Sequence, residues 1–140
     1  YLDFFPGIVD EHGVMRGPAG NGRVGAVARQ DVAQSAVAVL RDPSPHAERT
    51  YDMTGPEVIS LTDMARIIGE AQGREVTYRE ETVEEAYASR AHYGAPAWQV
   101  DAWVSTYTAI ASGELNVVSD SVRALTGRSP LSMADLLGQG

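Results

Sequence analysis

A glycine-rich segment has the spacing of a ligand-binding loop. Gly20-Asn21-Gly22-Arg23-Val24-Gly25 matches the G-x-G-x-x-G pattern, whose glycines let a backbone approach the pyrophosphate of a dinucleotide. Such a loop follows a strand and opens a helix, whereas here the next helix starts only at Asp31. Asn21-Gly22 is also a strong hairpin signal, because both residues tolerate positive φ. We therefore predict a β-hairpin between strands at 14–16 and 23–29, with dinucleotide binding as the alternative.

Few side chains in the chain could carry out other catalytic chemistry. There is no cysteine, which excludes thiol catalysis, thiolate metal sites and disulfides, and all 11 basic residues are arginine. His12, His46 and His92 are scattered through expected loops and lack metal-site spacing. No G-x-S-x-G segment offers a serine nucleophile. The sequence therefore predicts no catalytic residue and no metal ligand.

Aromatic side chains gather in one stretch of the chain. Trp103 and Tyr107 are four residues apart and share a helix face, whereas Tyr87 and Trp98 border a loop that contains glycine and proline. Large rings beside a flexible loop, with Tyr93 among them, suit an apolar pocket with a lid. Helix packing also explains them. Both interpretations stay open, with Trp103 expected in the core and Trp98 at the pocket.

The carboxylates have structural explanations. Asp31 precedes an apolar-periodic helix and is expected to cap it. Glu80, Glu81, Glu84 and Glu85 suggest a cation site, but they lack the interleaved ligands of a calcium loop. We expect them to form a solvated acidic face at a helix N-terminus.

The elements that position these residues alternate irregularly. Apolar residues at helical spacing predict helices over 31–40 and 61–71, the second opened by a capping box at Ser60 and Asp63. The other expected elements are a short helix or extended piece over 1–9, strands over 50–54 and 75–79, and helices over 82–91, 96–112, 119–126 and 132–137. A doubly wound sheet needs several long apolar strands. This order indicates a helix-rich α/β piece whose strands would join a larger sheet.

The composition is that of one soluble globular domain. The chain has 140 residues, of which 44% are hydrophobic and 21% charged. A net charge of −8 argues against nucleic acid and anionic membranes as partners. No signal peptide is visible, so we expect a cytoplasmic protein. The chain starts at Tyr1 and not at Met, so we expect processing or a missing upstream part.

Five segments occur in the order known from one family. They read RGPAGNGRVGAVARQDVA at 16–33, RTYDMTGP at 49–56, SLTDMA at 60–65, GREVTY at 73–78, and LTGRSP with MADLL at 125–130 and 133–137. These segments resemble NmrA-like proteins, which are atypical members of the extended short-chain dehydrogenase/reductase superfamily. The resemblance is nearest to NAD(P)H:quinone oxidoreductase-like members and looser to triphenylmethane reductases.

The resemblance implies where the chain lies in a larger fold. Residues 1–140 would be the helix-rich, substrate-side C-terminal lobe of an NAD(P)-binding Rossmann-type fold, with the dinucleotide-binding part outside this chain. Tyr1 and Asp3 would lie near the cofactor, because Tyr1-Leu2-Asp3-Phe4 looks like the end of a family segment in which Asn is common at the fourth place. The Tyr-x-x-x-Lys dyad of typical members cannot exist without lysine, and atypical members often lack it.

The resemblance also implies a function. The full-length protein would reduce a quinone or a similar small apolar acceptor by hydride transfer from NADPH or NADH, and this chain alone would be inactive. Phe4, Phe5, Tyr93 and Trp98 would form the acceptor-side wall and lid. Two alternatives stay open, a non-enzymatic redox-sensing regulator and a stand-alone binding domain. The latter would form a homodimer through residues 1–9.

Overall fold

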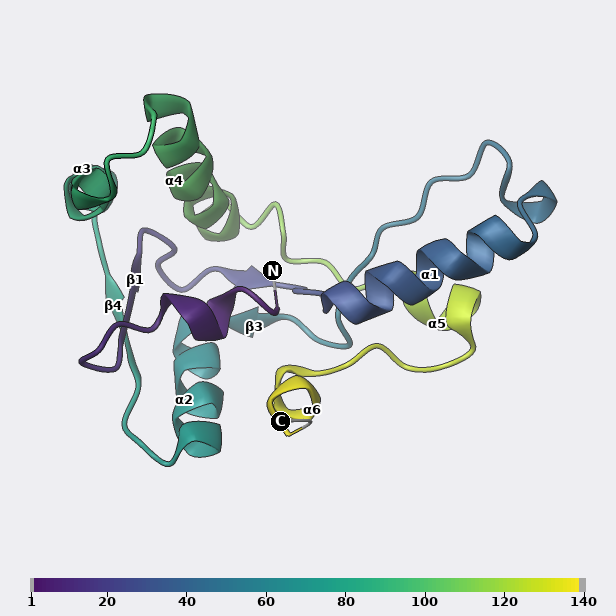
Figure 1. The fold of residues 1–140 in the computed structure, drawn as a ribbon, viewed down its shortest axis with the longest axis horizontal. Coiled ribbons are helices and arrows are strands. Elements are labelled where there is room, and N and C mark those ends of the chain that lie inside the picture. Colours follow the sequence, from purple (N-terminus) through teal and green to yellow (C-terminus); the bar gives the residue numbers. More distant parts are fainter. Residues whose placement is uncertain (1, 139–140) are drawn as a thin grey trace.

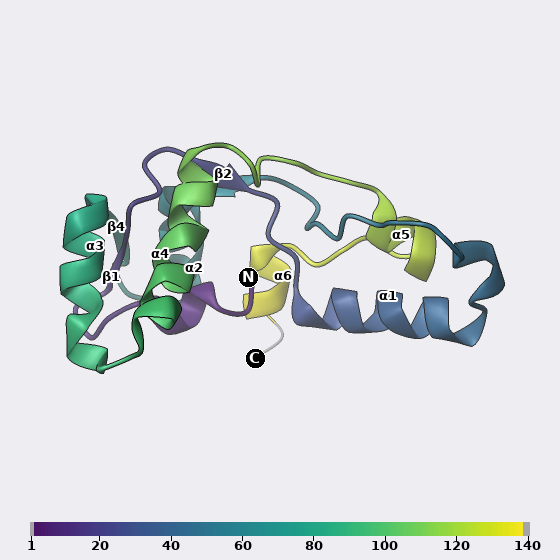
Figure 2. The same ribbon diagram turned by 90° about the horizontal axis from the view of Figure 1, so that it is seen from above.

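A computed structural model describes residues 2–138 of the chain (Figure 1). Within these residues, four short strands form two small sheets. β1 (Val14–Gly17) pairs in parallel with β4 (Thr77–Glu80), and β2 (Arg23–Val24) pairs antiparallel with β3 (Ile59–Ser60). The helices α3 (Val83–Arg90) and α4 (Ala97–Ala111) lie on one side of these strands, and α2 (Leu61–Gln72) and α6 (Met133–Leu137) lie on the other. The helices α1 (Arg29–Arg41) and α5 (Ser121–Thr126) extend away from them (Figures 1 and 2). The fold is mixed α/β and rich in helix, as predicted.

The predicted β-hairpin is wrong. Its two strands pair with β4 and β3, which come much later in the sequence, and not with each other. A turn does form, but over 19–22, where the Gly22 amide donates to the Ala19 carbonyl at 2.9 Å and Gly20 is the residue with positive φ. The Tyr78 hydroxyl, however, donates to the Gly17 carbonyl and accepts from the Ala19 amide. A side chain from β4 thus holds the segment between β1 and β2.

Capping boxes open three of the helices described within residues 2–138. α2 (Leu61–Gln72) starts after Ser60, α3 (Val83–Arg90) after Thr82 and α6 (Met133–Leu137) after Ser132. In each, the cap side chain accepts from the third amide of the helix, whose own carboxylate accepts from the cap amide. α2 ends at Gly73, which adopts the left-handed conformation at φ 64°.

The remaining elements match the predictions less uniformly. They are α1 (Arg29–Arg41), α4 (Ala97–Ala111), α5 (Ser121–Thr126) and the 3₁₀ turns η1 (Phe5–Ile8), η2 (Ser44–His46) and η3 (Ala91–Tyr93). The strand expected over 50–54 is wrong, because that segment pairs with no strand. Its polar groups bond instead to Ser119, whose amide donates to the Thr54 hydroxyl at 2.8 Å and whose hydroxyl donates to the Asp52 carbonyl.

The hydrophobic core surrounds the apolar face of α2. Leu61, Met64 and Ile68 are fully buried there and belong to one cluster with Leu2 and Phe5 from the N-terminal segment. Burying such side chains stabilises a fold by about 1.5–3 kcal/mol each. The N-terminal segment is therefore a part of this core.

Asp31 does not cap α1 as predicted. It lies inside the helix, fully buried, and accepts from the Arg128 guanidinium and the Leu131 amide, both at 2.8 Å. The first amide of α1, that of Arg29, donates instead to the Asp3 carboxylate at 2.7 Å. Because Asp31 directs the polar side of α1 towards the C-terminal segment, the apolar side of the helix faces outwards. Val32, Val37 and Leu40 are exposed.

Candidate functional site

The main cavity lies between the N-terminal segment, β1, η3 and α4. Its volume is about 940 Å³, which is in the range of small-molecule sites. Aromatic and aliphatic walls come from Phe4, Ile8, Tyr93, Trp103 and Tyr107. We call this cavity the aromatic pocket.

Ring contacts hold the aromatic wall in place. The Tyr93 ring meets Trp103 edge-on at 5.8 Å between centroids and lies 3.9 Å from the His92 ring. Tyr107 is buried at the base, and burial is the main cause that raises its hydroxyl pKa. Gly17 of β1 packs against the Tyr107 ring so closely that a methyl group at Gly17 would overlap it. The pocket base is therefore set by a strand-to-helix contact.

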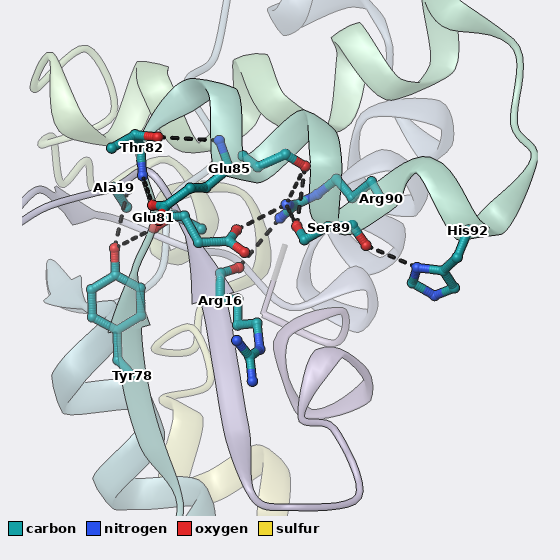
Figure 3. A network of polar contacts seen from close by, with 11 residues as sticks. Arg16, Ala19, Tyr78, Glu81, Thr82, Glu85, Ser89, Arg90 and His92 are labelled. Carbon is teal, nitrogen blue, oxygen red and sulfur yellow. Dashed lines mark hydrogen bonds and ion pairs between the residues drawn. The ribbon is translucent and has the colours of Figure 1, made fainter.

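Arg90 is the centre of a polar network at the edge of the pocket (Figure 3). Its Nη1 donates to the Glu81 carboxylate at 3.0 Å, to the Ala86 carbonyl at 2.9 Å and to the Ser89 hydroxyl at 3.0 Å. Its Nη2 donates to the Arg16 carbonyl at 3.3 Å, and its guanidinium stacks 5.2 Å from the Tyr107 ring centroid. The network ties α3 to β1. The expected solvated acidic face is corrected at one position. Glu81 is buried and ion-paired, whereas Glu80, Glu84 and Glu85 are exposed.

A second arginine lines the same pocket. Arg16 projects from β1 on the side of Val14, whereas Met15 and Gly17 alternate into the core. Its Nη2 lies 3.5 Å from the Asp10 carboxylate. Asp10 accepts from the Val14 amide at 2.8 Å and the His12 amide at 2.9 Å, and the Val14 bond is the main cause that lowers the carboxyl pKa. The pocket thus combines aromatic walls with ionised groups.

The predicted acceptor-site residues fall in different places. Phe4 and Tyr93 line the aromatic pocket. Phe5 is fully buried in the core, and Trp98 is 70% exposed at the start of α4, outside the pocket wall. Trp103, which the sequence assigned to the core, is half-buried and lines the pocket.

The residues predicted near the cofactor are described in part. Asp3 caps α1 and lies 3.8 Å from the Arg29 Nε, whereas Tyr1 lies outside the described residues. The glycine-rich segment does not fit a pyrophosphate. A methyl group at Gly22 would overlap the Ile110 carbonyl and one at Gly25 the Val117 carbonyl, so these glycines face other backbone at van der Waals contact. Their close approach serves packing.

Sequence reasoning missed Asp10, Arg16 and Arg90 as pocket residues. The strand pattern held a signal for Arg16, since it shares a β1 face with Val14, two residues earlier. Arg90 could not be found in this way, because its partners Glu81 and Arg16 meet it only through the fold. Within residues 2–138, no group of three or more His, Asp or Glu side chains could hold a metal ion. None of the described helices combines the length and the apolar character that crossing a bilayer requires.

Comparisons with known proteins identify the class of protein. No protein-family model matches the chain. It is 32% identical over 127 residues to an NAD(P)H azoreductase of Xenophilus azovorans, covering 91% of this chain and 44% of the relative. A triphenylmethane reductase of Citrobacter sp., solved with NADP(H), superposes with a TM-score of 0.86 at 28% identity over 99% of this chain and 50% of that one. An NADPH-dependent quinone oxidoreductase of Escherichia coli superposes at 0.81 with 25% identity, over 99% and 50% of the two chains.

These relatives agree with the resemblance of the sequence to NmrA-like members of the short-chain dehydrogenase/reductase superfamily. The structure of the chain matches the C-terminal parts of NADPH-binding reductases, which confirms the fold expected from the sequence resemblance. The chain spans about half the length of the curated relatives it matches, 44% in the first two.

Proposed function

We propose that this chain is the acceptor-binding lobe of an NAD(P)H-dependent oxidoreductase, which reduces a quinone or a similar small aromatic acceptor by two electrons. The observation that carries the proposal is the aromatic pocket. Phe4, Tyr93, Trp103 and Tyr107 surround a space of about 940 Å³, large enough for a ligand of one to three fused rings. Relatives named for azo, dye and quinone substrates support an aromatic acceptor.

The cofactor would be held by another part of the complete protein. Because Gly22 and Gly25 are packed against backbone carbonyls, we assign no cofactor contact to them. NADH or NADPH would supply the electrons, while the residues described here would orient the acceptor and exclude water. No described side chain is assigned a proton-transfer role.

The exposed face of α1 supports a larger assembly. Val32, Val37 and Leu40 are exposed, although a helix with an apolar side normally buries it. We assign the covering surface to the cofactor-binding part of the same protein, since the relatives are about twice as long. A homodimer through this face is the competing assembly, whereas the segment over 1–9 has less apolar surface to offer because Leu2 and Phe5 are buried in the core.

The test is a reductase assay on the complete protein. We expect NADPH or NADH oxidation, followed at 340 nm, that depends on a quinone, an azo dye or a triphenylmethane dye. Cofactor binding measured by calorimetry with no turnover on any of the three would reject the enzyme and favour the redox-sensing regulator. Absence of both binding and turnover would favour a stand-alone binding domain.

A further inference from the structure

The charge of the aromatic pocket differs from that of the whole chain. The chain carries a net charge of −8, yet two arginines, Arg16 and Arg90, line the pocket against one aspartate, Asp10. Coulomb interactions strengthen in a partly enclosed, apolar space. Because the Glu81 carboxylate offsets the charge of Arg90, the attraction of the pocket for an anion depends on Arg16.

Arg90 is not available to a ligand. Its guanidinium donates four hydrogen bonds to protein atoms and stacks on Tyr107. The side chain is only 11% exposed, and its charge is offset by the buried Glu81 carboxylate behind it. Arg90 thus shapes the pocket but has little capacity left for a ligand.

Arg16 is available. Its side chain is 37% exposed, and among residues 2–138 its guanidinium makes only the 3.5 Å ion pair to Asp10. That distance is longer than a good charge-assisted hydrogen bond of about 2.7–2.9 Å. The strand fixes the direction of the side chain, because its two neighbours in β1 are buried in the core. A guanidinium with five donors in a planar fork suits a carboxylate or a sulfonate.

Asp10 sets how strongly Arg16 attracts an anion. The Asp10 carboxylate is held by the amides of Val14 and His12, so it cannot turn away when a ligand arrives. Its charge competes with a ligand for the Arg16 guanidinium. Replacing Asp10 and replacing Arg16 should therefore have opposite effects on an anionic ligand.

We propose that the aromatic pocket selects aromatic acceptors that carry an acidic group, and that Arg16 binds this group while Phe4, Tyr93 and Trp103 hold the rings. The proposal rests on the assignment of the pocket as the acceptor site. It adds a specificity residue and a substrate class, acidic in place of neutral aromatic acceptors.

The test compares two probes that differ in charge. Naphthalene-2-sulfonate and naphthalene-2-sulfonamide have the same ring system, and their affinity for the complete protein is measured by calorimetry without turnover. We expect the sulfonate to bind more tightly. Arg16→Gln should weaken sulfonate binding about three- to tenfold, the range for a partly exposed ionic contact, and leave sulfonamide binding within about twofold.

Three variants control the experiment. Asp10→Asn keeps an oxygen for the Val14 and His12 amides but loses the charge, so it should strengthen sulfonate binding. Arg16→Lys should retain part of the preference, because it keeps the charge and loses the fork. Arg41→Gln removes an exposed arginine from the C-terminal end of α1, outside the pocket lining, and should change neither affinity.

The outcomes separate this inference from the proposed function. Equal affinity for both probes in the unaltered protein, or equal losses for both probes in Arg16→Gln, would overturn the role of Arg16. A lower sulfonate affinity in Asp10→Asn would also overturn it, since it would indicate that the pair acts only structurally. Sulfonate preference without reductase activity would leave the site in place and reject the enzyme. Reductase activity without sulfonate preference would support the enzyme and reject the role of Arg16 in binding an acidic group.

Discussion

Glu81 has a structural role that the neighbouring glutamates lack, because it forms a buried ion pair with Arg90. Glu81 stands in a run of glutamates, yet its side chain is 5% exposed. A buried carboxylate is costly unless a cation and hydrogen bonds satisfy it. Arg90 provides both, nine residues later, and also reaches the backbone of β1. The pair is therefore a structural support of the pocket edge.

Breaking this pair should be costly. Glu81→Gln leaves the Arg90 charge buried and unneutralised, so we expect the free energy of unfolding to fall by about 3–5 kcal/mol in urea denaturation. The matched control is Glu70→Gln, which breaks the exposed 2.7 Å pair with Arg66 on α2 and should cost less than about 1 kcal/mol. Similar losses in the two variants would contradict the support role.

The position of Trp98 makes the prediction that it acts as a lid residue more specific. The ring is exposed and lies outside the pocket wall, so it could contact an acceptor only if the segment before α4 closes. We expect Trp98→Ala in the complete protein to raise the acceptor KM severalfold and leave the cofactor Kd unchanged. Tyr87→Ala removes another exposed ring outside the pocket and is the control. An unchanged KM and kcat for Trp98→Ala would reject the lid.

At the scale of elements, the capping box of α2 links helix stability to pH. The Asp63 carboxylate accepts from the Ser60 amide at 3.1 Å and the Ser60 hydroxyl at 2.8 Å. These bonds, the backbone one first, lower the pKa of Asp63 below its ordinary value of 3.8, although desolvation opposes them. A lowered folded pKa means stabilisation above the unfolded value, lost as the pH falls through the folded value.

The lowered pKa of Asp63 leads to a prediction about how stability changes with pH. Asp63→Ala should lower the free energy of unfolding by about 1 kcal/mol at pH 7, the usual cost of a lost cap. The difference from the unaltered protein should shrink as the pH falls below 3.8. Glu57→Ala, at an exposed loop position, is the control. Urea titrations at neutral and acidic pH give the comparison, and a difference that stays constant with pH would contradict the account.

Substitutions in the glycine-rich segment, residues 20–25, distinguish a role in packing from a role in cofactor binding. Because a methyl group at Gly22 would overlap the Ile110 carbonyl, Gly22→Ala should cost about 2 kcal/mol or more of stability through a forced backbone shift. The cofactor Kd of the folded protein should stay the same. Gly7→Ala is the control, since its new methyl group meets nothing within 4 Å. A large increase in the cofactor Kd without loss of stability would restore the dinucleotide-loop interpretation.

For the whole molecule, the outer face of α1 is the feature that calls for another surface. In Figure 1, α1 and α5 project away from the core, and Asp31 on the polar side of α1 accepts a hydrogen bond from Arg128, which follows α5. The apolar residues of the helix thus remain uncovered by the described chain. If the cofactor-binding part covers them, they bury area that stabilises the complete protein.

A matched pair of valines tests this assembly. Val37 in α1 and Val83 in α3 are both 45% exposed in the described chain. In the complete protein we expect Val37→Gln to lower the free energy of unfolding by about 1–2 kcal/mol, as for loss of a buried aliphatic side chain. Val83→Gln should change it by less than about 0.5 kcal/mol. Equal effects would argue against a covered α1 face.

The sequence by itself determined the locally encoded features. Serine and threonine caps with an acidic residue three places on specified where α2, α3 and α6 begin, because those hydrogen bonds close within one turn. Apolar spacing located the helices over 31–40 and 61–71, and five ordered segments indicated the family. These features depend on neighbours within a few residues, so no knowledge of the fold is needed.

Only the tertiary structure decided the strand partners and the pocket. β1 and β4 are separated by 59 residues before they pair, so the Asn21-Gly22 turn could not reveal that β4 would displace the hairpin. Asp31, Glu81 and Arg16 look alike as charged residues in the sequence. In the fold, Asp31 and Glu81 are buried and ion-paired, whereas Arg16 faces an apolar cavity. Burial and long-range pairing fix the free energy of a charge, and neither is set by local sequence.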